Sequence, residues 1–454
     1  MSRRLAFSRY KQMRWFSTKE RMKVTDTVNE LLSNDKLKHK QHPGILKPKQ
    51  VEQPSWLAGA VRNILHDRTF SLQGISVSGQ KLAAHLHSRQ PPPEKKDIRL
   101  KMKEVQSRLN ECNEMQDLNN DDKFVDSKAE RLLRTLLYNW APIQYDTYTS
   151  LAYLVSRSMP EYSALYKIFN EIVSNDKNFT PSTLFDFGSG TGTVMWAASK
   201  FWVNSIKEYY CVDISKDMHE LSEYLIKKAI PQVELKHIFY RQFFPASPIP
   251  TYDIVVSAYS LLELPHQMSR LEIISKLWHK TEQYLIIIEH GTNVGFRLVN
   301  EARDFILSSK NAHDAHVFSP CPHDTKCPRY TTDDTPCNFE ITYLTLPIGG
   351  NSMYKCERYS YVVLKKGKRP ENDCKWPRIV RQVLKRSGHA VCRMCTASGK
   401  LEEQIFTKWK NGKNTYRCAR SSEWGDRLPF ETVEVEEEEK VEQEEKLKKE
   451  EEHT

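Results

Sequence analysis

The sequence has no apolar run that approaches the roughly 20 residues needed to cross a bilayer as a helix. This lack excludes the helical membrane proteins, and we expect a soluble protein with no membrane partner. The chain has 454 residues, of which 39% are hydrophobic and 28% are charged. A chain of this size can bury one large core with smaller modules beside it, so we expect a central domain with additions at both ends.

Acidic residues are missing from the first 19 positions, which hold six basic residues. The apolar residues of this segment fall mostly on one side of a helical wheel, and this composition is typical of a mitochondrial transit peptide. Arg14-Trp-Phe-Ser17 resembles the arginine-containing sites at which matrix presequences are cut. We therefore predict that residues 1–16 are removed and that the protein lies in the mitochondrial matrix; a basic disordered tail is the alternative.

Charge is distributed unevenly at the other end of the chain. Residues 431–454 contain 12 Glu and 4 Lys, so they carry −8 of a total of +10 and leave +18 on the rest. A repeat this acidic cannot bury apolar surface, and we predict a solvated helix or a disordered tail. The basic body favours a polyanionic partner, and we expect RNA and not DNA.

Short apolar strands alternate with helical stretches in the middle of the chain. The expected strands are Thr183–Asp186, Tyr209–Asp213, Asp253–Ser257 and Tyr284–Glu289, and Phe339–Leu346 and Tyr359–Lys365 could add an antiparallel pair at the edge. This alternation predicts an α/β fold with a doubly wound, Rossmann-like parallel sheet. The segments before it have helical apolar spacing, including Ala129–Tyr138 and Tyr162–Val173, and predict a mostly helical N-terminal region.

A glycine loop, Asp186-Phe-Gly-Ser-Gly-Thr-Gly192, follows the first of these strands. Its glycines allow a tight turn and a close approach to a ligand at the carboxyl edge of the sheet. A dinucleotide loop would have glycine where Thr193 stands, whereas the form found here resembles S-adenosylmethionine methyltransferases. Asp213 ends the second strand, where a carboxylate can accept hydrogen bonds from ribose hydroxyls. The candidate cofactor-binding residues are Asp186, Gly188, Gly190, Gly192 and Asp213.

Catalytic motifs of nucleic-acid methyltransferases are missing. The segment Ser257–Pro265 stands where amino methyltransferases carry an Asn/Asp-Pro-Pro-aromatic turn, and the sequence places no cysteine as a nucleophile for cytosine C5 transfer. We therefore predict no catalytic residue. Methyl transfer can proceed largely by positioning, so this lack does not exclude activity.

The chain contains ten cysteines, and three of them lie close together at Cys321, Cys327 and Cys337. A disulfide framework is improbable in the reducing matrix, so metal ligation explains the cluster better. The C-x-x-C pair Cys392 and Cys395 can supply a fourth ligand. Four thiolates suit zinc or an iron–sulfur cluster. Irregular spacing, Cys-Pro dipeptides and a single C-x-x-C pair favour the cluster, with zinc or unligated thiols as alternatives.

Basic residues recur near the C-terminus and predict contacts with an RNA backbone. Helical spacing places Arg378, Arg381, Lys385 and Arg386 on one face of a predicted helix. Asn411-Gly412 predicts a hairpin turn flanked by further basic residues, namely Lys408, Lys410, Lys413 and Arg417. Three tryptophans in this part of the chain could stack on bases, but we expect them in the core: Trp376, Trp409 and Trp424.

Four segments carry a specific resemblance: Glu289–Phe296, Cys321-Pro-His with Cys327-Pro, Trp376–Ile379 through Lys385-Arg386, and Arg417–Arg420 with Trp424–Asp426. From about residue 148 to 428 the chain resembles the mitochondrial methyltransferase-like family that assembles the small ribosomal subunit. The resemblance implies binding to the rRNA and proteins of that subunit, a fold that binds S-adenosylmethionine with its activity lost, and a 4Fe-4S cluster. The ligands that it implies are Cys321, Cys327, Cys337 and Cys392.

Two hypotheses follow for the function: a non-catalytic assembly factor that binds rRNA, which we favour, and an active rRNA methyltransferase with a structural cluster. The predicted organisation is a transit peptide at 1–16, a mostly helical region at 17–180, a methyltransferase-like domain at 181–370 with a Cys-rich insertion at 310–340, a basic, β-rich, metal-stapled module at 371–430, and an acidic tail at 431–454.

Overall fold

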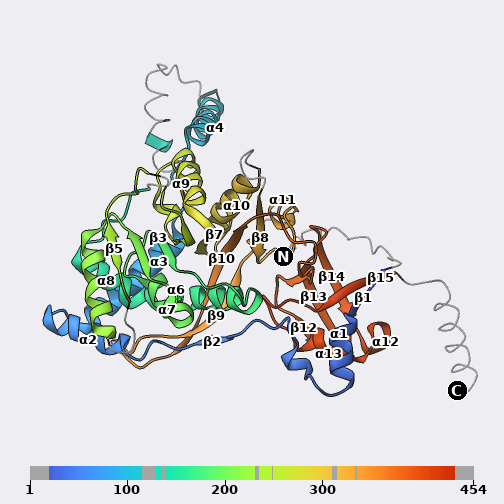
Figure 1. Cartoon of the computed structure of the whole chain (residues 1–454). Helices are drawn as coiled ribbons and strands as arrows, with labels where there is room; N and C mark the ends of the chain where they lie inside the picture. Colours follow the sequence, from blue (N-terminus) through green and yellow to red (C-terminus); the bar gives the residue numbers. More distant parts are fainter. Residues whose placement is uncertain are drawn as a thin grey trace, which may run out of the picture.

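A computed structural model describes residues 20–434 of the chain, apart from 115–128, 130, 134–139, 231–234, 248, 309–313, 333–334 and 349 (Figure 1). The predicted transit peptide and most of the acidic tail therefore lie outside the described residues. Among the helices that the structure describes, none combines the length and the apolar character needed to cross a membrane.

A large mixed sheet forms the centre of the molecule. Its strands in the described residues are β2 (Gln50–Val51), β3 (Thr183–Phe187), β4 (Glu208–Val212), β5 (Ile238–Arg241), β6 (Tyr252–Ala258), β7 (Thr281–His290), β8 (Ala315–Ser319), β9 (Phe339–Leu344) and β10 (Tyr354–Lys366). Their order is β2-β9-β10-β7-β6-β3-β4-β5, and β8 also pairs with β10. Strands β5, β4, β3, β6 and β7 are parallel, whereas β10 runs antiparallel to its neighbours.

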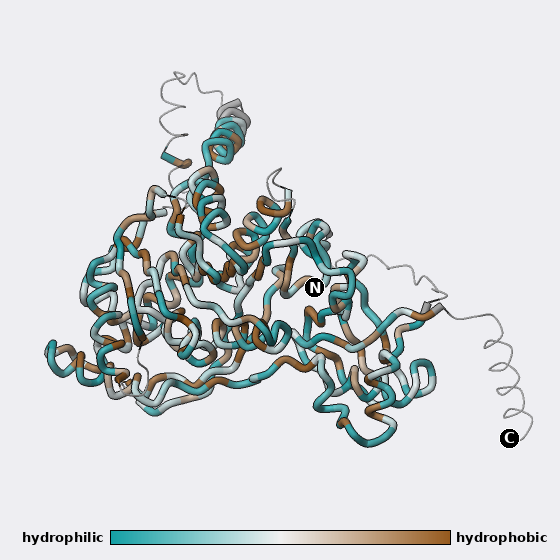
Figure 2. Tube along the Cα trace, viewed as in Figure 1, coloured by the Kyte–Doolittle hydropathy of each residue, from teal (hydrophilic) through white to brown (hydrophobic). Residues whose placement is uncertain are grey.

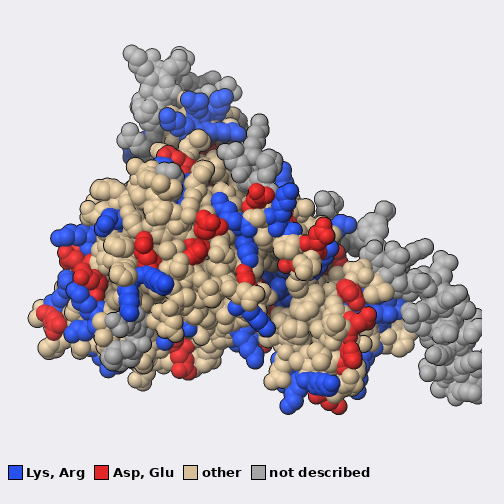
Figure 3. Space-filling view, viewed as in Figure 1, with Lys and Arg blue, Asp and Glu red and all other residues tan. Residues whose placement is uncertain are grey.

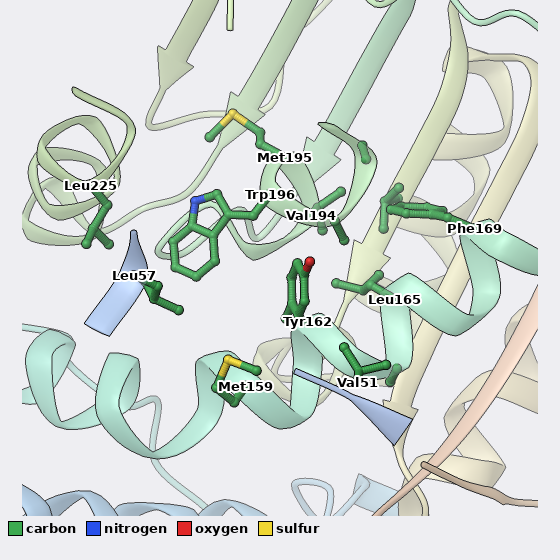
Figure 4. Close-up of a cluster of buried hydrophobic side chains, with 14 of the residues drawn as sticks. Val51, Leu57, Met159, Tyr162, Leu165, Phe169, Val194, Met195, Trp196 and Leu225 are labelled. Carbon is green, nitrogen blue, oxygen red and sulfur yellow. The ribbon is translucent and has the colours of Figure 1, made fainter. Parts of the chain in front are cut away.

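Helices cover both faces of this sheet. One face buries a core with α2 (Leu57–Asp67), α3 (Leu72–Ser88), α6 (Thr147–Asn175), α7 (Thr193–Trp202) and α8 (Lys216–Ala229), and the other buries a core with α9 (Gln267–Lys280) and α10 (Asn293–Ser308). In the first core, Trp196 of α7 lies close to Leu57 and Leu225 (Figure 4). Parallel strands covered on both faces are apolar throughout, as in the predicted runs. The prediction of a doubly wound methyltransferase sheet is confirmed.

The N-terminal region is mostly helical, as predicted, but it does not form one unit. Helices α2, α3 and α6 pack on the sheet, and α4 (Lys95–Glu114) projects from it. Figure 2 shows hydrophobic residues running through the central strands, whereas α4 is mostly hydrophilic. Of the predicted helix at Ala129–Tyr138, residues 129 and 131–133 are described, and they are helical.

The first described residues pack against the C-terminal module. Strand β1 (Glu20–Val24) pairs antiparallel with β15 (Phe430–Glu434), and α1 (Asp26–Ser33) contributes Val28 and Leu32 to the module's core. Figure 1 shows this blue segment beside the red one. The structure thus separates residues 20–46 from the helical region to which the sequence assigned them. It also places residues 431–434, predicted as part of the tail, in a strand.

The C-terminal module is β-rich, as predicted. It contains β11 (Arg378–Ile379), β12 (Leu384–Arg386), β13 (His389–Cys395) and β14 (Leu401–Phe406), followed by α12 (Lys408–Asn411) and α13 (Lys413–Ser421). The predicted helix over 378–386 is wrong, because the β-branched Ile379, Val380 and Val383 are buried in this sheet module. The predicted hairpin at Asn411-Gly412 is also wrong. Gly412 joins two helices with a left-handed φ of 82°.

Candidate functional site

The glycine loop joins β3 to α7 at the carboxyl edge of the parallel strands. Its three glycines have φ values of 74°, 47° and 87°. A Cβ atom on Gly188 would lie 2.5 Å from the Cβ of Ser260, and one on Gly192 would lie 2.5 Å from the Oγ of Ser222. A Cβ on Gly190 would meet only a backbone oxygen at 4.0 Å. Packing therefore requires two of the glycines, and Gly190 is the one that faces open space.

Asp213 lies beside this loop, directly after β4. Its Oδ2 accepts a hydrogen bond from the backbone N–H of Gly190 at 2.8 Å, and its Oδ1 accepts one from Ser215 at 2.9 Å. Burial raises the pKa of Asp213 despite these two hydrogen bonds. The carboxylate thus holds the loop itself, a role that the sequence did not predict. Each carboxylate oxygen has a further lone pair with which it can accept from a ribose.

Asp186, at the end of β3, is fully buried, and neither of its carboxylate oxygens has a hydrogen-bond partner within the described part of the chain. Burial, and then the nearby charge of Asp213, raises the pKa of Asp186 well above its usual range. A buried carboxylate without a partner is costly and calls for a donor or a cation. The positively charged groups of S-adenosylmethionine supply that chemistry. The residues present therefore fit this cofactor.

Residues 140–147 bridge the carboxyl ends of β4 and β6, next to the loop. The Oγ of Ser215 donates to the carbonyl of Tyr145 at 2.7 Å, and the indole N–H of Trp140 donates to the carbonyl of Leu262 at 3.2 Å. Arg89, which is almost fully buried, pairs with Glu263 and donates to the carbonyl of Ala141 at 3.0 Å. The N-terminal region thus covers this edge of the sheet. Local sequence patterns gave no signal for these contacts.

The segment after β6, where a catalytic turn would stand, is tied to its surroundings. The Oγ of Ser260 lies 2.8 Å from the Oγ of Ser257 and donates to the carbonyl of Phe187 at 3.2 Å. The backbone N–H of Leu261 donates to Glu289 at 2.9 Å. Burial raises the pKa of Glu289 to about 8. Ser257, Ser260 and Glu289 therefore stabilise the contacts between the strand ends through hydrogen bonds.

Four thiols line one small cavity between the central sheet and the C-terminal module: Cys321, Cys327, Cys337 and Cys395. The first follows β8, the second precedes α11 (Pro328–Thr332), the third precedes β9, and the fourth ends β13. Burial and the neighbouring thiols raise the pKa of Cys327 to about 11 and those of Cys337 and Cys395 further. In the ranges that the structure describes, no three His, Cys, Asp or Glu side chains are arranged as ligands of a single metal ion.

The structure places Cys395, and not Cys392, with the three upstream cysteines. Cys392 is fully buried in the core of the C-terminal module, with its Sγ 4.0 Å from the carbonyl oxygen of Ala419. Side chains alternate between the faces of a strand, so residues three apart on β13 point to opposite sides. The sequence left both candidates open and the family resemblance implied Cys392, whereas the structure brings Cys395 into the cavity with the other three thiols.

The sequence did not predict the polar residues that surround this cavity. The Nε2 of His323 lies 3.2 Å from the Sγ of Cys395. Arg303 donates to the carbonyls of His323 and Thr325 at 3.2 and 2.6 Å, and Arg378 donates to the carbonyl of Pro320 at 3.0 Å. Arg303 and Arg378 thus stabilise the Cys-rich segment by donating to its backbone carbonyls. Positive charge close to a thiol also favours the thiolate form.

The predicted basic face divides into structural and exposed residues. Arg378 is buried in an ion pair with Glu171, and Arg381 lies over the ring of Trp424 at 5.6 Å. Lys385 and Arg386 are exposed instead. Figure 3 shows Lys and Arg spread over the visible face, with a group on α4.

Comparison with known proteins gives a family. The model of the family described as Mitochondrial small ribosomal subunit Rsm22 matches residues 147–429. The chain is 36% identical over 416 residues to Ribosome assembly protein METTL17, mitochondrial, from Homo sapiens, and this alignment covers 90% of each chain. It is 29% identical over 338 residues to Rsm22-cox11 tandem protein 2, mitochondrial, from Schizosaccharomyces pombe, which covers 62% of this chain and 43% of that protein.

Among solved structures, magnesium protoporphyrin IX methyltransferase from Synechocystis PCC 6803 with bound SAM is 12% identical. The match has a TM-score of 0.31 and covers 58% of this chain and 97% of that one. The family model matches more than half of the chain, and the human relative aligns over nearly all of it. The chain therefore belongs to the mitochondrial small ribosomal subunit Rsm22 family.

Proposed function

We propose that this protein is an assembly factor of the mitochondrial small ribosomal subunit, that it acts in the matrix, and that it binds rRNA. The observation that carries the proposal is the alignment over 90% of both chains with a human protein named as a mitochondrial ribosome assembly protein. Residues 20–430 carry a net charge of +12, and this basic body supports a polyanionic partner.

S-adenosylmethionine is the cofactor that we assign to the glycine loop. Gly190 leaves room for the ligand, Asp186 supplies a buried carboxylate, and Asp213 holds the loop and would accept hydrogen bonds from the ribose. When bound, this cofactor supplies an electrophilic methyl group. The chain's own part would be to bind and orient the cofactor next to residues 140–147, which cover this edge of the sheet. The polar groups after β6 are engaged with one another and with the backbone. We therefore assign binding without catalysis.

An active rRNA methyltransferase is the second candidate. The open space at Gly190 and the unpartnered carboxylate of Asp186 favour this candidate. Burying a carboxylate without a partner costs free energy, and a cofactor used in catalysis would account for that cost. Methyl transfer needs few catalytic groups when the reactants are well positioned.

A 4Fe-4S cluster is the group that we assign to Cys321, Cys327, Cys337 and Cys395. The support is the one cavity that these four thiols share, together with the thiolate chemistry of iron–sulfur ligation. The first three belong to the Cys-rich insertion and Cys395 belongs to the C-terminal module, so the cluster would join the two structurally.

The decisive experiment compares cells that lack the protein with cells that re-express it. Loss should lower the amount of assembled small subunit in density gradients, and wild-type protein should sediment with small-subunit precursors. A variant that cannot bind S-adenosylmethionine should restore the subunit if the protein is a non-catalytic factor. Failure of that variant, together with a methyl group missing from the small-subunit rRNA, would establish the enzyme instead. Unchanged subunit levels without the protein would refute both.

A further inference from the structure

A broad groove crosses the C-terminal module on the side formed by the first and the last described segments of the chain. It has a volume of about 1120 Å3 and lies between the N-terminal segment β1, α1 and η1 (His39–Gln41) and the helices α12 and α13. Strand β15 contributes Glu431 and Val433 to its wall. The groove lies apart from the glycine loop and from the cysteine cavity, since it shares no lining residue with them.

Positive charge predominates in this groove. Its lining contains Arg21, Lys23, Lys410, Lys413 and Arg417 against Asp26, Asp35 and Glu431. Lys410, Lys413 and Arg417 are exposed, and no carboxylate of the described residues lies within ion-pair distance of them. The last two stand four positions apart on α13 and therefore share one face of that helix. Three cations without partners suit the phosphates of a nucleic acid.

Trp409 stands at the same groove with 74% of its surface exposed. We expected it in the core, as Trp376 and Trp424 are, since both of those are partly buried against other side chains. An indole left in water beside lysines has no packing role on this face. It is suited to stack on an unpaired base.

The groove is preorganised by contacts between the two ends of the chain. Asn414 donates to Asn29 at 2.9 Å and to Ser33 at 3.1 Å, and its Oδ1 lies 3.1 Å from the Nε2 of His39. The Oγ1 of Thr415 accepts from the backbone N–H of Val24 at 3.2 Å. These bonds fix α13 against the N-terminal segment, so the cations on the exposed side of α13 are held at the groove before any ligand arrives.

We propose that this groove binds a single-stranded RNA segment, with phosphates at Lys410, Lys413 and Arg417 and one base stacked on Trp409. The inference rests on the proposed function and specifies where the rRNA is held. A single strand is required because the bases of a duplex are already stacked and cannot reach the indole. The combination of exposed indole and free cations favours RNA over an acidic protein segment.

The test uses the full mature chain and a fluorescently labelled RNA oligonucleotide of mixed sequence, offered single-stranded and as a duplex. Wild-type protein should prefer the single strand. Trp409→Ala should weaken that binding by about 5- to 150-fold, whereas Trp409→Phe should retain most of it. Phe243→Ala removes a ring that is 75% exposed at another place and should change nothing.

Charge reversal gives a second, independent measurement. Lys413→Glu with Arg417→Glu should weaken binding and reduce the salt dependence of the affinity, because fewer counterions are released. Lys200→Glu, on the exposed side of α7, is the matched control and should have little effect. Circular dichroism and thermal melting confirm that each variant is folded.

Several results would overturn the inference. One is unchanged single-strand affinity in Trp409→Ala, and another is equal loss in Lys200→Glu. If the groove variants lose small-subunit association but keep RNA affinity, the groove takes a protein segment instead. Failure of the proposed function is separate: wild-type protein would not sediment with the small subunit, although the groove would still bind RNA.

Discussion

Arg378 of the C-terminal module forms a buried ion pair with Glu171 of α6, and this pair joins the module to the helical layer of the central sheet. Both side chains are almost fully buried. Arg378 also donates to the carbonyls of Pro320 and Gly425 at 3.0 and 2.8 Å, so one guanidinium contacts three separate segments. Burial acts to raise the pKa of Glu171, but the charges of Arg378 and Arg427, together with hydrogen bonds from Arg378 and Tyr361, hold that pKa below its usual range.

Breaking this pair should destabilise the protein. Arg378→Met leaves a buried carboxylate without its cation, and we expect a loss of about 3 to 5 kcal/mol in the free energy of unfolding. The double change of Arg378→Met with Glu171→Met should recover part of that loss. Chemical denaturation measures both, and Arg393→Met, which breaks a half-exposed pair with Glu403, should cost at most about 1 kcal/mol.

The same pair predicts a dependence on pH. Because the pKa of Glu171 is lowered in the folded state, its contribution is complete above the ordinary glutamate pKa and is lost as pH falls through the lowered value. The difference in stability between wild type and Arg378→Met should therefore be largest at high pH and shrink as the pH falls toward the lowered pKa. Unfolding curves over that range measure it, and a difference independent of pH would contradict the assigned role of Glu171.

Changes in the glycine loop should abolish binding of S-adenosylmethionine. Gly190→Val places a branched side chain at a φ of 47° and in the space left for the ligand, and Asp213→Ala removes the acceptor that holds the loop. Calorimetry on folded protein measures the binding. Gly350→Val, where a Cβ would meet nothing within 4 Å, is the control. Unchanged binding in both loop variants would show that the cofactor site is elsewhere.

The metal centre should depend on Cys395 and not on Cys392. Changing Cys321, Cys327, Cys337 or Cys395 to Ser should remove the cluster, because a hydroxyl is a poor replacement for thiolate at iron. Cys392→Ser and Cys418→Ser should retain it, since both thiols lie in the module's core. Anaerobically purified wild-type protein should be brown and contain iron and acid-labile sulfide. Colourless protein with stoichiometric zinc would replace the cluster with a zinc site.

Import should depend on the first 16 residues. Deleting residues 1–16 removes a basic segment without acidic residues, and the protein should then stay in the cytosol. Fractionation of cells that express the deleted and the full chain measures this, and mass spectrometry of the mature protein should find Ser17 at its N-terminus. Matrix import of the deleted chain would place the signal elsewhere.

The sequence predicted the central fold well because its signals are local. The strands at Thr183–Phe187 and Thr281–His290 are apolar runs next to helical spacing, and a parallel sheet buried on both faces produces that pattern. The glycine loop was equally clear, since its turn constrains the residue types directly. The packing of Gly188 against Ser260 could not be predicted in this way, because it is a contact between distant segments.

The remaining features depend on partners that local patterns do not contain. In the sequence, Arg378 is not distinguishable from the other basic residues. Only the fold shows that it pairs with Glu171, which lies over 200 positions earlier. Cys392 and Cys395 have nearly the same spacing from Cys337, and only the side on which each points from β13 separates them. Trp409 is of a residue type that is usually found in the core, but its side chain is exposed.

The pairing of β1 with β15 links residues 20–24 to residues 430–434, close to the two ends of the described chain. A protein that enters an organelle with its N-terminus first delivers these strands at the beginning and at the end of its passage. If the predicted transit peptide leads this chain across, strand β1 has no partner until almost the whole polypeptide has crossed. A chain stalled or cut before residue 430 leaves an unpaired edge, which is a recognisable mark for a protease or chaperone. The groove wall formed by β15 is thus complete only in molecules that contain residues 430–434.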